Sequence, residues 1–142
     1  MVDNLSKKKR SKVMASIRGT NTMPEMAVRK ILWSIGKRYR VHDRTVFGTP
    51  DISHKGKKVA VFIDGCFWHG CSICYKEPST NVEYWRNKIR RNKERRILVT
   101  RHLSSSNWTV LEFWEHQVLN EPNSVAKKIS RAMQDTMSCQ SN

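Results

Sequence analysis

The segment DGCFWHGCSIC, residues 64–74, constrains the fold more than any other part of the chain. It places three cysteines within nine residues, at positions 66, 71 and 74. Cys71 and Cys74 are separated by two residues, which is the usual spacing of a zinc ligand pair on a tight turn. Cys66 lies close enough in sequence to bind the same ion. Three reduced cysteines without metal are the alternative, but their spacing favours a structural zinc site.

A tetrahedral zinc ion needs a fourth ligand from another segment. His116 is the best candidate, because it follows an apolar strand and would tie the loop to the end of that strand. His69 competes with it, and Cys139 is a weaker candidate in a polar tail. We therefore expect this site to consist of Cys66, Cys71, Cys74 and His116.

Hydrophobic periodicity predicts a mixed order of helices and strands. Helices are expected at residues 6–19, 22–36 and 81–103, with a polar helix after residue 114. Strands are expected at residues 39–43, 50–54, 57–64 and 108–114. The run at residues 59–63 is almost wholly apolar, as in a central strand covered on both faces. This order predicts an α/β fold in which helices flank a mixed central sheet.

Local signals mark several helix ends. Thr22 and Glu25 have the spacing of a capping box, and Pro24 suits the first turn of the helix that follows. Gly36 is a plausible C-terminal stop, and Asn107 is expected to be left-handed after the long basic helix.

The formal net charge is +15, with a pI of about 10.2, so a polyanion such as nucleic acid is the expected partner. Basic residues gather near residues 7–12 and 86–96. No apolar run of about eighteen residues suggests a membrane span. No apolar segment follows the basic N-terminus, so a secretory signal is not expected either. We expect an intracellular, cytoplasmic protein, associated with the nucleoid when it is bound to DNA.

A possible catalytic hairpin precedes the cysteine-rich segment. Asp51 follows a proline at the start of one strand, and Asp64 ends the next strand. This pattern is typical of PD-(D/E)xK nucleases, whose acidic groups hold Mg²⁺ beside the phosphate. The motif lysine is missing, because Gly65 and Cys66 follow Asp64. His69 is the candidate to replace it in proton transfer or charge stabilisation.

Several motifs together resemble the very-short-patch-repair (Vsr) endonuclease family. SKVM, the PD pair, DGCFWHGC, YWRNKI and FWEH occur in the family's order. The resemblance implies a PD-(D/E)xK-type nuclease core and strand-specific nicking of DNA at a T:G mismatch. Such mismatches arise when 5-methylcytosine deaminates. The resemblance also implies catalytic Mg²⁺ and structural Zn²⁺ as cofactors.

The resemblance also assigns roles in catalysis. It implies that Asp51 binds Mg²⁺, that the backbone carbonyl of Ile63 also contacts the ion, and that His69 is the catalytic imidazole. Glu25 supports the site, although the capping box explains it equally well. Asp64 either binds metal-bound water or polarises His69.

The family's aromatic wedge enters the DNA stack beside the mismatch, and Phe67 and Trp68 match it. Adjacent residues cannot easily face one core, so we favour the wedge for this pair over a structural role. For Trp85, support of the wedge and core packing are equally plausible. Further matches to DNA-contacting positions are Met14, Lys88 and Asn92, and the N-terminal basic patch includes Lys12 and Arg10.

Three functions remain open at this level: a mismatch nicking enzyme, a restriction-type endonuclease that cuts paired DNA, and a zinc-stabilised DNA-binding module without catalysis. The expected organisation is a basic N-terminal arm (1–20), a nuclease domain (21–134) and a flexible tail (135–142). We expect a monomer without a membrane partner, and mismatch-repair helper proteins are possible partners.

Overall fold

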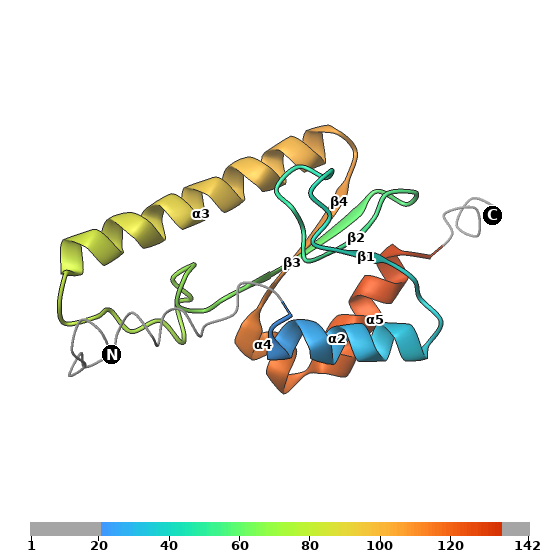
Figure 1. Cartoon of the computed structure of the whole chain (residues 1–142), viewed down its shortest axis with the longest axis horizontal. Helices are drawn as coiled ribbons and strands as arrows, with labels where there is room; N and C mark the ends of the chain where they lie inside the picture. The colour runs from blue at the N-terminus through green and yellow to red at the C-terminus, as the bar shows by residue number, and fades with distance from the viewer. Residues whose placement is uncertain (1–20, 135–142) are drawn as a thin grey trace.

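The computed structural model describes residues 21–134. The expected N-terminal helix, with Arg10, Lys12 and Met14, lies outside these residues, and so does the tail with Cys139. The described elements are α2 (Met23–Ser34), β1 (Arg40–Val41), β2 (Ile52–His54), β3 (Val59–Asp64), α3 (Val82–Ser105), β4 (Thr109–Trp114), α4 (Glu115–Asn120) and α5 (Pro122–Ala132) (Figure 1).

The four strands form one sheet in the order β1-β2-β3-β4. β1 and β2 pair antiparallel, as do β2 and β3, whereas β3 and β4 run parallel after the crossover through α3. The mixed sheet is therefore confirmed. Asp64 pairs with Trp114 at the carboxyl ends of the two parallel strands. The cysteine-rich loop and α4 consequently leave the sheet at the same edge.

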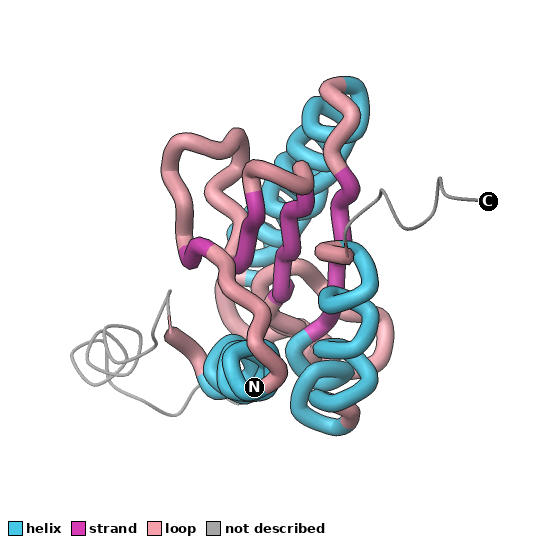
Figure 2. The backbone as a smooth tube through the Cα atoms, turned by 90° about the vertical axis from the view of Figure 1, so that its right-hand side faces the viewer, coloured by secondary structure: helices cyan, strands magenta, loops and turns pink. Residues whose placement is uncertain are grey.

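Helices cover both faces of the sheet, as expected (Figures 1 and 2). Side chains alternate along β3, so Val59 and Val61 pack against α2, α4 and α5, while Ala60 and Phe62 pack against the C-terminal half of α3. Each of these four β3 side chains is at most 1% exposed, which confirms the central strand. The N-terminal half of α3 extends beyond the sheet, alongside the loop that contains the cysteines (Figure 1).

Two local predictions about helix ends are confirmed. Gly36 has φ +83°, and the N–H of Lys37 donates to the carbonyl of Leu32, which is the Schellman arrangement. Asn107 is left-handed, with φ +66°.

Two other predictions are wrong. Thr22 is the N-cap residue of α2 but makes no side-chain capping bond, and Glu25 accepts the N–H of Asn21 instead. The reason is that tertiary partners hold the Glu25 carboxylate. The single polar C-terminal helix is two helices, α4 and α5, because Pro122 starts a new helix. α5 is also not wholly polar, since it buries three apolar side chains in the core.

Within residues 21–134, no helix is both long enough and apolar enough to cross a bilayer.

Candidate active site

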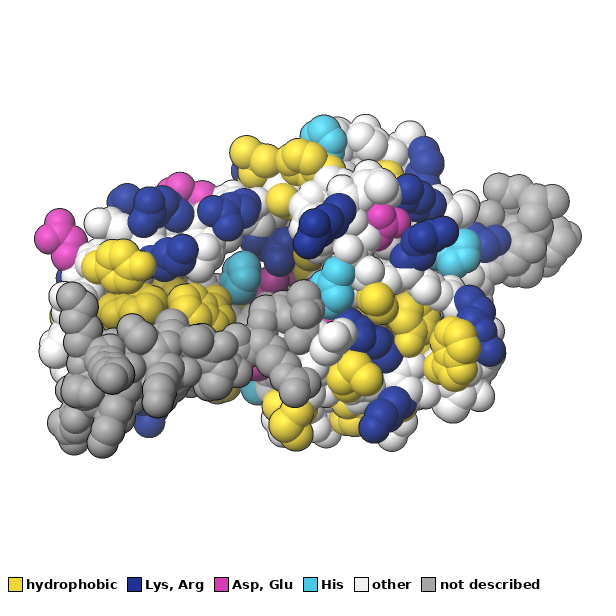
Figure 3. All heavy atoms as spheres, viewed as in Figure 1, with side chains coloured by type: hydrophobic (Ala, Val, Ile, Leu, Met, Phe, Trp, Pro, Cys, Tyr) yellow, Lys and Arg dark blue, Asp and Glu magenta, His cyan; other side chains and the backbone are white. Residues whose placement is uncertain are grey.

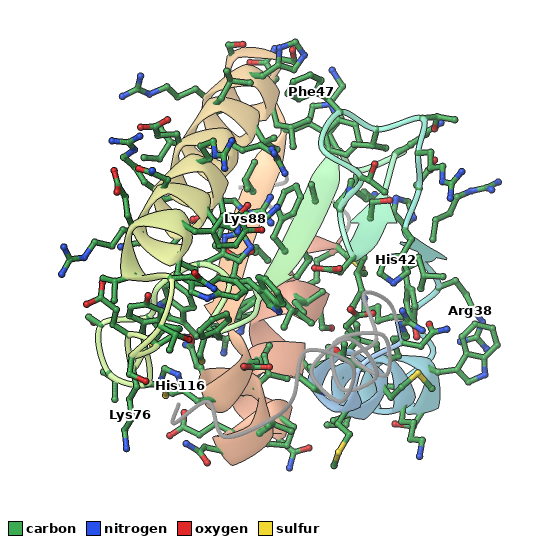
Figure 4. The ribbon with its side chains drawn as sticks, turned by 60° about the vertical axis from the view of Figure 1, so that its left-hand side comes forward. Arg38, His42, Phe47, Lys76, Lys88 and His116 are labelled. Carbon is green, nitrogen blue, oxygen red and sulfur yellow. The ribbon has the colours of Figure 1, made fainter. Side chains whose placement is uncertain are left out.

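A cleft of about 760 Å³ opens where β3 ends, between the start of α2 and the middle of α3. It brings together residues far apart in the sequence, such as Glu25 of α2 and Arg96 of α3. The sequence-predicted residues that line it are Glu25, Asp51, Ile63, Asp64, Phe67, Trp68, His69, Lys88 and Asn92. His42 and Lys88 lie on opposite sides of the end of the sheet (Figure 4). The cleft is the candidate active site.

Asp51 lies just before β2, and its Oδ2 accepts the backbone N–H of Ile63 on β3 at 2.7 Å. Burial raises the pKa of Asp51 to about 6, and the nearby Glu25 carboxylate also raises it, although the Ile63 N–H opposes the shift. A buried carboxylate of this kind gains much from a cation, because the cation offsets the cost of desolvating its charge. Oxygen ligands of this type suit Mg²⁺.

Glu25 is almost fully buried beside Asp51 and contacts His42, a residue that no sequence pattern singles out. Glu25 Oε2 lies 2.9 Å from His42 Nε2 and 2.9 Å from Arg29 Nη2. His42 Nδ1 lies 3.7 Å from Asp51 Oδ1. His42 carried no signal in the sequence, since it lies in a short expected strand and matches no motif. Only the pairing of β1 with β2 places it beside Asp51.

Asp64 is paired with Arg96 of α3, which was also missed. Arg96 Nη2 lies 2.7 Å from Asp64 Oδ1, and its guanidinium stacks 3.9 Å from the centre of the Phe62 ring. Asp64 Oδ1 also lies 3.6 Å from His69 Nε2. Several arginines follow one another on α3, and nothing in the sequence singled out this one. Asp64 therefore lies within ion-pair distance of both Arg96 and His69.

Replacing Arg96 by Met should destabilise the fold by about 3–5 kcal/mol, because it leaves the buried Asp64 carboxylate without its ion-pair partner. Arg90→Met is a matched control on the same helix, since Arg90 is exposed and lies 3.9 Å from Glu94. Its effect should stay within about 0.5 kcal/mol. Urea denaturation measures both, and equal effects of the two variants would contradict the role given to Arg96.

The aromatic residues of the turn after β3 form a half-buried cluster outside the two hydrophobic cores. The Phe67 ring lies 5.2 Å from Trp68 and 5.3 Å from Trp85 of α3, measured between centroids. Asn92 of α3 donates to the carbonyl of Trp68 at 2.8 Å. A Cβ at Gly70 would lie 2.7 Å from Ile89, so α3 packs tightly on this turn. Helix α3 thus holds the backbone of this turn, while the side chains of Phe67 and Trp68 line the cleft.

The three cysteines of the loop lie together with His116 of α4. One ligand atom from each of the four residues lies within 4.8 Å of the others. His116 Nδ1 lies 3.3 Å from Cys66 Sγ and 3.6 Å from Cys71 Sγ. The N–H of Cys66 donates to Glu115, which ties the loop to α4. The structure therefore brings together a Cys3His group that can hold a metal ion, and leaves His69 in the cleft.

Residues 2–76 match the family model described as DNA mismatch endonuclease Vsr. The type II nicking enzyme V.HpaIIP of Haemophilus parainfluenzae is 40% identical over 135 residues, which cover 93% of this chain and 96% of that protein. V.NmeDIP of Neisseria meningitidis serogroup C is 40% identical over 136 residues, with 94% and 92% covered. The DNA mismatch endonuclease Vsr of Escherichia coli K12 is 36% identical over 117 residues, with 81% and 74% covered.

These similarities extend over most of the chain, including both sides of the cleft. The protein is a DNA endonuclease, an enzyme that hydrolyses phosphodiester bonds. It belongs to the Vsr family, as the resemblance of its motifs indicated. The hypothesis of a DNA-binding module without catalysis is thereby set aside.

Proposed function

We propose that this endonuclease nicks one strand of duplex DNA at a T:G mismatch, depends on Mg²⁺, and acts in very short patch repair. The observation that carries the proposal is the cleft, in which Asp51, His69 and Asp64 stand beside the aromatic pair Phe67 and Trp68. Asp51 and Asp64 sit at neighbouring ends of the antiparallel β2–β3 hairpin, which supports a PD-(D/E)xK-type core. The mismatch is proposed as the target because the family and the Escherichia coli relative are both described as DNA mismatch endonucleases.

Catalysis is assigned to the polar groups that line the cleft. Mg²⁺ would be held by Asp51 and the carbonyl of Ile63, and when bound it polarises the phosphate and makes a water molecule more acidic. Burial lowers the pKa of His69, against the opposing effect of Asp64, so the imidazole is neutral near pH 7. A neutral imidazole can accept a proton from the attacking water. Asp64, fixed by Arg96, orients this ring, and Glu25 supports the Asp51 side of the cleft.

DNA is proposed to lie along α3. Figure 3 shows Lys and Arg side chains along this helix, above a group of hydrophobic side chains. Lysines and arginines neutralise phosphates and supply most of the sequence-independent affinity. Lys88 lines the cleft and is assigned to a phosphate near the cut. Asn92 already donates to the carbonyl of Trp68, so it positions the aromatic turn as well.

The double variant Phe67→Ala/Trp68→Ala should lose its preference for T:G over T:A duplexes. Base-aromatic stacking is worth about 1–3 kcal/mol per base, and a mismatched step unstacks more easily than a paired one. Salt-sensitive duplex binding should persist, because the basic residues of α3 remain. Affinity ratios and melting temperatures should be measured on one preparation. A sharply lower melting temperature with an unchanged T:G-to-T:A ratio would show that the pair only packs.

The Cys3His group is proposed to hold a structural zinc ion. In a tetrahedral site with Zn–S near 2.3 Å and Zn–N near 2.0 Å, neighbouring ligand atoms lie about 3.5–3.8 Å apart. The distances from His116 Nδ1 to Cys66 and Cys71 are 3.3 and 3.6 Å, so the residues fit this ion. Burial raises the pKa of Cys66 to about 12, and a bound cation is what would make this thiol a thiolate ligand at neutral pH.

One experiment tests the proposed function. Matched duplexes that differ only in one T:G, T:A or C:G pair are incubated with the enzyme and Mg²⁺, with each strand carrying its own label. We expect a nick in one strand of the T:G duplex only. Equal cutting of the paired duplexes would favour a restriction-type endonuclease, and cutting of both strands would contradict strand-specific nicking.

A further inference from the structure

The imidazole of His42 lies between two carboxylates that the proposed function already uses. Its Nε2 lies 2.9 Å from Glu25 Oε2, and its Nδ1 lies 3.7 Å from Asp51 Oδ1. These three residues are the second group within residues 21–134 whose potential ligand atoms all lie within 4.8 Å of one another. Figure 4 shows His42 well apart from His116, so this group is separate from the Cys3His group.

The hydrogen bonds decide which nitrogen of His42 is free. Arg29 Nη2 and His42 Nε2 both lie 2.9 Å from Glu25 Oε2, and both can donate to it, as the backbone N–H of Asn21 does. Arg29 Nη2 also lies 3.0 Å from His42 Nε2, but a lone pair on Nε2 would face the Glu25 carboxylate, which only accepts. Nε2–H is therefore directed at Glu25, and Nδ1, which lies 3.7 Å from Asp51 Oδ1, keeps its lone pair. A distance of 3.7 Å is too long for a hydrogen bond between Nδ1 and that carboxylate.

Two electron-rich atoms at this separation suit a shared cation. Ligand atoms about 2.2 Å from one ion lie roughly 3–4 Å from each other. Histidines that bind metals commonly donate their other N–H to a carboxylate, which fixes the ring and makes it more basic. Glu25 has this outer position here, and Arg29 balances its charge.

The backbone at His42 supports a functional role. His42 has φ +47°, in the left-handed region that residues other than glycine rarely adopt. Its N–H donates to the carbonyl of Asp51 at 3.3 Å, so the strained residue is tied to the residue it faces. Such strain gathers at functional sites, where the surrounding structure maintains it.

We propose that His42 Nδ1 is a direct ligand, together with Asp51, of the divalent cation in the cleft, and that Glu25 is its outer hydrogen-bonding partner. This rests on the proposed function, which places a cation at Asp51. It adds a nitrogen ligand to a site otherwise made of oxygens. Because imidazole favours transition metals over Mg²⁺, the site should accept Mn²⁺ and later first-row ions well.

Mn²⁺ without DNA is the probe, since its electron spin reports directly bound nitrogen. Zinc-loaded, magnesium-free enzyme is titrated with Mn²⁺, and pulsed EPR searches the bound ion for ¹⁴N modulation from one imidazole. We expect this signal in the wild type and its absence in Asp51→Ala, which removes the ion. His42→Gln should lose the ¹⁴N signal and bind Mn²⁺ at least about tenfold more weakly, whereas Glu25→Gln should keep the signal with weaker binding.

His102→Gln is the matched control, because His102 is exposed on α3 and its ring packs on Phe47. Its binding and spectrum should equal those of the wild type. An Asp51-dependent Mn²⁺ site without ¹⁴N modulation in the wild type would overturn the proposal, as would modulation that survives in His42→Gln or the absence of an Asp51-dependent site. Mg²⁺-dependent T:G nicking is measured on the same proteins. Nicking that requires Asp51 while the wild type shows no ¹⁴N signal would refute the role of His42 and leave the proposed function standing.

Discussion

Replacing Asp51 by Asn should reduce Mg²⁺-dependent nicking by about three orders of magnitude or more, because it removes the anionic ligand of the proposed catalytic ion. DNA binding should persist, since the basic residues of α3 are unchanged. Single-turnover nicking of a T:G duplex measures the first effect, and a gel-shift titration measures the second. Glu94→Gln, an exposed change on α3, is the matched control and should retain full activity. Unchanged nicking in Asp51→Asn would refute the assignment.

The Asp51→Asn variant should also be more stable than the wild type in magnesium-free buffer. Burial raises the pKa of Asp51 to about 6 in the folded protein, above its ordinary value of 3.8. The folded state therefore binds the proton more tightly, and stability falls as the pH rises from about 4 to 6. Above this range the charged carboxylate costs about 3 kcal/mol, because each tenfold difference in proton affinity corresponds to about 1.4 kcal/mol.

Asparagine does not carry this charge and can still accept the Ile63 N–H. Denaturation of the wild type and of Asp51→Asn at pH 8 and at pH 5 tests the sign of this stability difference. The advantage of Asp51→Asn should be largest at pH 8 and about half as large at pH 5, and Mg²⁺ should stabilise only the wild type. A less stable Asp51→Asn protein at pH 8 would contradict the picture of a destabilising, desolvated carboxylate.

Removing the proposed zinc ligand His116 should abolish both metal binding and nicking. Binding of a structural zinc ion supplies on the order of 10 kcal/mol of folding free energy, and the loop it would hold carries Phe67, Trp68 and His69. His116→Ala protein should contain no zinc and melt at a much lower temperature. His69→Ala is the matched comparison, because it should keep one zinc per chain and its melting temperature while losing nicking.

Elemental analysis of protein purified without chelators, together with thermal melting, separates the two histidines. Loss of zinc in His69→Ala with retention in His116→Ala would reverse their roles. Wild-type protein without zinc would refute the metal site.

Several features of this protein depend only on residues close together in the chain, and the sequence alone was enough to predict them. The apolar run at residues 59–63 indicated a buried strand, because a strand covered on both faces carries apolar side chains at successive positions. Gly36 and Asn107 follow helix ends in the left-handed conformation, which glycine adopts because it has no Cβ and asparagine adopts more readily than most residues. The crowded cysteines at residues 66–74, the Pro-Asp pair and the motif DGCFWHGC indicated the family, because each lies within a few residues of chain.

Other features depend on partners far away in the sequence, and only the tertiary structure decided them. Glu25 could equally cap α2 or serve the cleft, and Arg29 with His42 draws its carboxylate into the cleft. In the sequence, nothing distinguishes Arg96 from the other arginines of α3. In the structure, α3 passes the end of β3 and places Arg96 beside Asp64. His42 had no local signal, because strand pairing alone brings it to Asp51. Sequence spacing predicts features that nearby residues form together. Ion pairs and metal ligands between distant residues depend on how strands and helices pack in space.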